Sequence, residues 1–194
     1  MNIGRGAVAG ARSFSTMPPE KLPEVWLRGP LPGVSPMLMP AAHCLMQCRE
    51  EIATAADLTT DQLWAKPGGA ASAGFHLRHI VGSLDRLLTY ARGAQLDRAQ
   101  LAYLRAEGEP GEPPDTAATL IASAQAAIDS AVQILRSTDD SDLMVARSVG
   151  RAALPSTVFG LLFHCAEHTH RHTGQLVTTA KIVRSRTLYA DHLA

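Results

Sequence analysis

Histidine is the residue type whose spacing in this sequence most directly suggests chemistry. Residues 164–176 read HCAEHTHRHTGQL, which places His164, His168 and His172 four residues apart. Positions i and i+4 of an α-helix lie on the same face, about one turn apart. Two imidazoles at this spacing can reach one metal ion. The segment therefore predicts a helix face that can supply two metal ligands.

A second group of histidines occurs earlier, in the segment FHLRHI at residues 75–80. His79 shares the apolar face of its predicted helix with Ile80 and Leu87, and His76 lies one turn earlier. A third imidazole from a facing helix would complete a site with three nitrogen ligands. Such a site suits a catalytic metal ion, because water or substrate must occupy the open coordination position.

The alternative is that these histidines are ordinary helix residues without a functional role. A single histidine in a helix is more often a core or surface residue with a satisfied hydrogen bond than a metal ligand. Here the sequence predicts three inward-facing histidines on one helix and two on another, which favours metal binding. Burying several imidazoles in an apolar interior is unfavourable unless each finds a polar partner, and a shared metal ion removes that penalty. We therefore expect a metal site, with either pair on the later helix able to supply it.

These histidines lie on two of four long segments in which apolar residues recur at helical spacing. The four segments cover residues 40–57, 72–93, 115–135 and about 155–183. Ser72 can cap the second helix and Asp115 the third, while Gly93 suits the left-handed residue that ends the second. A short helix is predicted at 97–106, and residues 138–154 are expected to be irregular. Few strand signals are present, so the pattern indicates an all-α bundle.

The charged residues outside the histidine groups give weaker indications of a functional site. Arg86 can bind a carboxylate on a substrate, but a surface ion pair is the commoner role for such a residue. Residues 107–114 (EGEPGEPP) read as a loop. Glu50, Glu51 and Glu167 can act as bases near a metal, although solvated charges on a helix face are more common.

Composition limits the classes of partner. Lys and Arg together number 18, as do Asp and Glu, so the net charge is zero. A protein that binds a nucleic-acid duplex usually carries a basic surplus or stripe, and this sequence has neither. The three cysteines form no disulfide framework and fit a reduced, cytoplasmic compartment. No apolar run looks long enough to cross a bilayer, so we expect neither nucleic acid nor a membrane as partner.

The length of 194 residues suggests one domain. Residues 1–35 are predicted to form a flexible or irregular extension, because the stretch 18–40 is rich in proline and glycine. Residues 36–185 should form the bundle, and 186–194 a C-terminal tail. The first 17 residues are basic and contain no acid, which allows a transit peptide. We favour the alternative that Met17 is the actual start.

Two motifs in these helices resemble the DinB/YfiT-like family of small metal-binding four-helix bundles. One is a helix-borne His-Ile with an upstream aromatic residue, here Phe75 and residues 79–80. The other is H-x-x-x-H-x-G-Q, here residues 168–175. The resemblance covers roughly residues 36–183. It implies an all-α four-helix bundle of the up-down-down-up type, preceded here by the Pro/Gly-rich extension.

The resemblance also implies a ligand set for one divalent metal ion. The family takes one histidine from the second helix and two from the fourth, which are here His79, His168 and His172. The Gly-Gln step at residues 174–175, shortly after His172, sets this register and argues against His164 as a primary ligand. Imidazole ligands suit Zn, Ni, Cu and Fe alike. We expect Zn, Ni or Fe, and favour Zn.

Three further histidines, His43, His76 and His164, are candidates for a supporting shell. Such residues can orient metal ligands or shuttle protons. The equally common alternative is an ordinary core or cap histidine. If His164 replaced His172 as a ligand, the site would move one turn along the bundle.

Members of the family look like metal-dependent transferases that join low-molecular-weight thiols to electrophiles, or like hydrolases. The resemblance therefore implies a small-molecule substrate, with a low-molecular-weight thiol as a candidate co-substrate and a homodimer as a candidate assembly. The alternative is a non-catalytic, stress-related bundle that binds a metal or ligand. An open coordination position favours the enzyme, whereas a shell closed by a fourth protein side chain favours the alternative.

Overall fold

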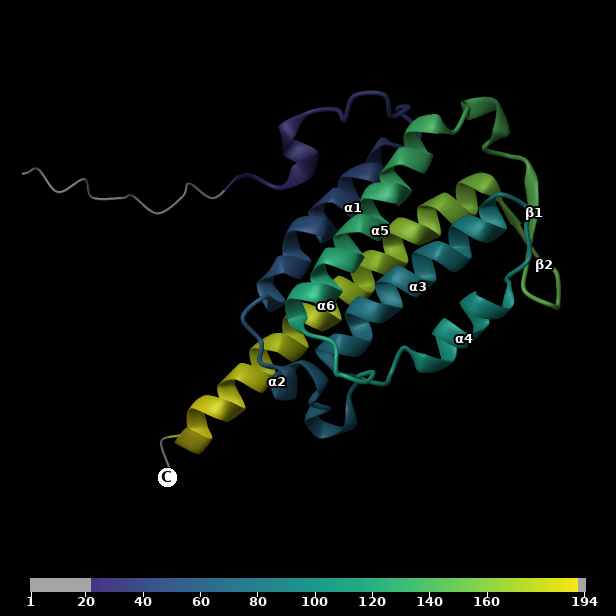
Figure 1. Cartoon of the computed structure of the whole chain (residues 1–194). Helices are drawn as coiled ribbons and strands as arrows, with labels where there is room; N and C mark the ends of the chain where they lie inside the picture. Colours follow the sequence, from purple (N-terminus) through teal and green to yellow (C-terminus); the bar gives the residue numbers. More distant parts are fainter. Residues whose placement is uncertain (1–21, 192–194) are drawn as a thin grey trace, which may run out of the picture.

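The computed structural model describes residues 22–191, with side chains described as far as residue 185 (Figure 1). The predicted N-terminal extension and C-terminal tail therefore lie partly outside the described residues, and their boundaries stay predictions. Met17 and the segment considered as a transit peptide lie outside them entirely.

Four long helices pack alongside one another and carry the core (Figure 1). They are α1 (Met39–Glu51), α3 (Ala73–Ala91), α5 (Ala117–Ser137) and α6 (Val158–Asp191). Helix α3 packs against both α5 and α6, and α1 packs against the same two helices. Their inward residues form one apolar cluster, in which Leu45, Leu77, Ile128 and Leu176 are fully buried. The predicted all-α class is confirmed.

The ends of α1 and α3 follow local sequence signals. Pro40 lies in the first turn of α1, where its missing N–H would have had no helical partner. Helix α1 ends before the predicted residue 57, because a 3₁₀ turn, η2 (Ile52–Ala55), takes over. The predicted cap of α3 is confirmed, since Ser72 Oγ accepts a hydrogen bond from Phe75 N at 3.1 Å. Gly93 follows α3 with φ of 79°, as its left-handed role requires.

The predicted cap of α5 is wrong by one residue. The capping side chain is Thr116, whose Oγ1 accepts a hydrogen bond from Thr119 N at 3.3 Å. Asp115 is used differently, because Arg78 Nε donates to its Oδ2 at 2.9 Å. A cap position that offers two adjacent polar residues leaves the choice to such tertiary contacts.

Shorter elements connect the long helices. The 3₁₀ turns η1 (Val25–Arg28) and η3 (Pro67–Gly69) and the helix α2 (Thr60–Trp64) precede α3. The region 138–154, predicted to be irregular, instead contains η4 (Asp140–Asp142) and most of a β-hairpin. Strand β1 (Ala146–Val149) pairs antiparallel with β2 (Leu154–Thr157). Gly150, with φ of 68°, begins the turn between the strands.

The predicted short helix at 97–106 is confirmed as α4 (Arg98–Ala106), which packs on α3. Asp97 caps it, because Asp97 Oδ1 accepts a hydrogen bond from Gln100 N at 2.8 Å. No residue within α4 is buried. The residue that ends it, Glu107, is by contrast only 2% exposed. The loop predicted from this residue therefore begins with a side chain that points into the protein.

By length and composition alone, α5 could cross a membrane, which the expectation from apolar runs missed. It is the one such helix among the described residues. Its alanines keep hydropathy high on every face, while one face packs into the core through Leu120, Ala124 and Ile128. The core helix of a soluble protein passes the same test, so α5 is weak evidence for a membrane span.

Candidate metal centre

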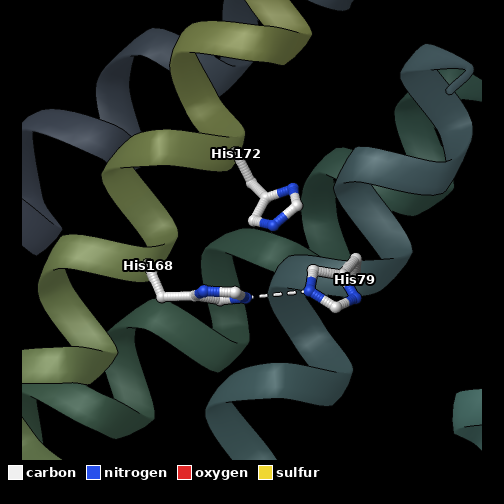
Figure 2. Close-up of side chains that lie close together, drawn as sticks. All are labelled: His79, His168 and His172. Carbon is white, nitrogen blue, oxygen red and sulfur yellow. Dashed lines mark hydrogen bonds between the residues drawn. The ribbon is translucent and has the colours of Figure 1, made fainter. Parts of the chain in front are cut away.

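Three imidazoles meet between α3 and α6 (Figure 2). His79 comes from α3, and His168 and His172 come from successive turns of α6. One ring nitrogen of each lies within 4.8 Å of the others. The ring centroids are 4.3 Å apart for His79 and His172 and 4.6 Å apart for His168 and His172. The structure thus brings together the three histidines predicted as ligands, in a group that could hold one metal ion.

One contact between ring nitrogens joins the two helices. His79 Nε2 lies 2.8 Å from His168 Nε2, and Figure 2 marks this contact. Without an ion between them, one of these nitrogens must carry the proton of a hydrogen bond. A metal ion bound by both would satisfy both lone pairs at once.

His79 is supported on the side away from the triad. Its Nδ1 lies 2.7 Å from Glu107 Oε2, and Arg86 Nη1 donates to Glu107 Oε1 at 2.6 Å. Phe75 stacks on the His79 ring, with centroids 5.2 Å apart and planes 18° apart. A carboxylate accepts hydrogen bonds only, so Nδ1 of His79 carries a proton, and in the neutral form of this ring the lone pair is on Nε2, which faces the triad.

The two α6 histidines have less support. His172 Nδ1 lies 3.1 Å from Nδ1 of His76, a buried residue of α3. His168 Nδ1 is buried and has no hydrogen-bond partner among the described residues. The α6 pair is therefore positioned mainly by the helix itself, which places residues four apart on one face.

Burial sets the protonation of these rings. It lowers the pKa of His168 to about 4, with a further contribution from the neighbouring His79. The same two causes, with His168 added, lower the pKa of His172 to about 3. The pKa of His76 is lowered to about 4 by burial and by His79. These rings are neutral at pH 7, which is the form that binds a metal ion, so the donor set fits a divalent cation.

The other predicted histidines lie in different places. His76 touches the triad through His172. His164 does not face inward as expected: its side chain is 46% exposed, with Nδ1 3.0 Å from Glu167 Oε2. Each step of four residues turns a helix face by about 40°, so a residue two steps from His172 rotates out of the face. His43 contacts the backbone instead, with Nε2 3.0 Å from Gly29 O.

The sequence did not predict the contact of Glu107 with His79, and it favoured a surface position for Arg86. Arg86 is not the surface residue expected, because it is buried and paired with Glu107. The signal that could have indicated this contact is Gly82, one turn before Arg86 on the apolar face of α3. A glycine within such a face often marks a close approach by another group.

A cavity of about 460 Å³ lies next to His76, the residue that contacts His172, and none of the three triad histidines lines it. His76 forms part of its wall, and α6 contributes Arg171, Gln175 and Thr178. Protein sites for small molecules commonly have volumes of roughly 300–1,000 Å³ with a few polar groups. The cavity can therefore hold a small molecule beside the His76–His172 contact.

The family model described as the DinB superfamily matches residues 45–176, more than half of the chain. The matched span includes all three converging histidines. No curated protein matches the chain significantly.

Proposed function

The chain belongs to the DinB superfamily, and from this premise we propose that it is a metal-dependent enzyme acting on a small molecule, as a transferase or a hydrolase. The observation that supports this most is the group of three converging imidazoles, of which His168 and His172 are neutral at pH 7. Among the described residues, this group of candidate ligands contains three side chains and no fourth. Three protein ligands leave a coordination position for water or substrate, as catalytic sites require.

His79, His168 and His172 would hold the ion, and we favour Zn²⁺ over Ni²⁺ or Fe²⁺. Neutral imidazoles suit all three, so the ligand set supports a divalent ion more than it selects one. When bound, the ion would supply Lewis acidity, which lowers the pKa of a water molecule or thiol in its open position. His79 presents Nε2 to the site because Glu107 occupies its Nδ1.

The cavity beside His76 is the place we propose for the substrate, where Arg171 and Gln175 offer polar contacts. If the reaction uses a thiol, that thiol belongs to a small molecule. The two core cysteines are poor nucleophiles, because burial raises the pKa of Cys165 to about 12. The pKa of Cys48 is also raised, by its hydrogen bond with Cys44 and by burial.

We further propose that the four long helices form the up-down-down-up bundle expected of the family, within residues 36–185. Their pairwise packing supports this arrangement. Zero net charge supports a small-molecule partner over a nucleic acid. A cytoplasmic location, no membrane partner and a homodimer complete the proposal. Three free cysteines among the described residues fit a reducing compartment.

The test of metal binding is a comparison of two neighbouring histidines on α6. The purified protein should hold about one divalent ion per chain by elemental analysis. His168→Ala should lose it, whereas His170→Ala should retain it, because His170 is exposed and lies off the triad face. Unchanged metal content in His168→Ala would reject the assignment.

A second experiment separates the enzyme from a non-catalytic metal-binding bundle. Metal-loaded and chelator-treated protein are assayed for conjugation of small thiols to electrophiles and for hydrolysis of small esters and amides. Turnover that needs both the metal and His168 supports the enzyme. Tight metal binding without turnover across these reactions supports the non-catalytic alternative.

A further inference from the structure

We propose that Glu107 is a positioning residue of the metal centre: held by Arg86, its carboxylate orients His79 and strengthens the binding of the metal ion by the triad. The inference rests on the proposed metal-binding function. It concerns Glu107, which is not one of the three proposed ligands. Glu107 lies on the segment that follows α4, so no helical spacing within α3 or α6 relates it to the ligands.

Both oxygens of the Glu107 carboxylate are engaged inside the protein. Oε2 faces His79 Nδ1 at 2.7 Å, and Oε1 accepts from Arg86 Nη1 at 2.6 Å. Glu107 is 2% exposed, and the partner side chains are 17% exposed for His79 and 11% for Arg86. Burying a carboxylate is unfavourable unless it is paired and hydrogen-bonded. Glu107 meets this condition only by contacting a proposed ligand and a counter-charge together.

The packing around Glu107 is an independent observation. Helix α3 has no side chain at the point where the carboxylate enters, because that position is Gly82. A Cβ there would lie 2.6 Å from Arg86 Nη1 and 2.8 Å from Tyr103 Cδ1, and would collide with Glu107 Oε1. The backbone of α3 is thus open at the one place that admits the carboxylate and the ring of Tyr103.

The physical effect is on the orientation and tautomer of one ligand. Without a partner at Nδ1, the His79 ring could rotate or carry its proton on Nε2, and either change removes the lone pair that faces the triad. Arg86 largely offsets the charge of Glu107, so net charge is the smaller part of the effect. Loss of such outer partners typically weakens metal binding by about 10–100-fold.

The test uses the full-length protein, Zn²⁺ and a competing chelator. Glu107→Gln should bind Zn²⁺ about 10–100-fold more weakly than the unchanged protein. The matched control is Glu109→Gln, a change of the same kind at an exposed position two residues away, which should bind as the unchanged protein does. If Glu107→Gln fails to fold, Glu107→Asp keeps the charge but draws the carboxylate back, and should weaken binding by a smaller factor.

A double-mutant cycle separates positioning from general structural support. Glu107→Gln is measured in the unchanged protein and in a His79→Ala background, both with Cu²⁺, which binds nitrogen ligands tightly enough for the weakened site. If Glu107 acts through His79, the second background shows no further loss. An equal loss in both backgrounds, or no loss in either, would overturn the inference. If the unchanged protein binds no ion at all, it is the proposed function that fails.

Discussion

The two helices that supply the triad hold their histidines in different ways. On α3, His79 is stacked on Phe75 and bonded to a carboxylate delivered by the segment after α4. On α6, His172 has one neutral partner, and His168 Nδ1 has none among the described residues. The comparison teaches that one helix can place two ligands by spacing alone. A single ligand on the facing helix needs contacts from elsewhere in the chain.

The largest expected effect is the loss of a ligand from either side. His79→Ala and His172→Ala should each weaken Zn²⁺ binding by more than about 100-fold, because loss of outer partners alone reaches that factor. Added imidazole should restore binding in His79→Ala more than in His172→Ala, since Phe75 and Glu107 remain to hold the free ring. Competition with a chelator, with and without imidazole, measures both. Equal rescue would contradict the comparison.

The second largest effect should be a loss of folding stability in acid, caused by the two histidines of α6. In the metal-free protein, the lowered pKa values of His168 (about 4) and His172 (about 3) mean that the unfolded chain binds more protons below about pH 6.5. Stability should therefore be complete above this pH and fall as pH drops toward 4. Urea unfolding at several pH values measures the slope. His172→Gln should flatten it, because this change removes one of the two rings whose pKa is lowered.

The smallest effects come from two glycines. Gly82→Ala on α3 should destabilise the protein by about 1–3 kcal/mol, because the added Cβ overpacks the Glu107 contact. Gly174→Ala on α6 meets open space and should stabilise it by about 0.5–1 kcal/mol through helix propensity. Thermal unfolding of both variants measures the difference. A similar shift in both would show that the two helices tolerate a side chain equally at these positions.

Sequence alone predicts what depends on local periodicity. Four-residue spacing and the apolar face indicated that α6 supplies a pair of ligands, the family resemblance selected His168 and His172 as that pair, and Ser72 marked the start of α3. The choice of His79 over His76 came from a family resemblance, because both lie on inward parts of α3. In the structure, His79 meets His168, whereas His76 meets only the far nitrogen of His172.

What the sequence could not show depends on contacts between distant segments. Glu107 precedes a Pro/Gly-rich stretch and reads as a solvated loop residue, since glutamate is rarely buried. Its partner Arg86 lies 21 residues earlier on α3, so no sequence periodicity links the two residues. The prediction that His164 faces inward was wrong, because the side-chain direction on a helix turns by about 80° over the eight residues between His164 and His172. The hairpin of β1 and β2 was missed because each strand has only four residues.

The contrast between α4 and Glu107, the residue that follows it, has a consequence for dynamics. Helix α4 buries nothing of its own, so local opening of this segment should require little free energy. Glu107 joins the segment to His79, and opening would withdraw that contact. Opening of α4 and release of the ion then become linked equilibria. Amide hydrogens of residues 98–107 should exchange more slowly with deuterium when Zn²⁺ is present, although this segment provides no ligand.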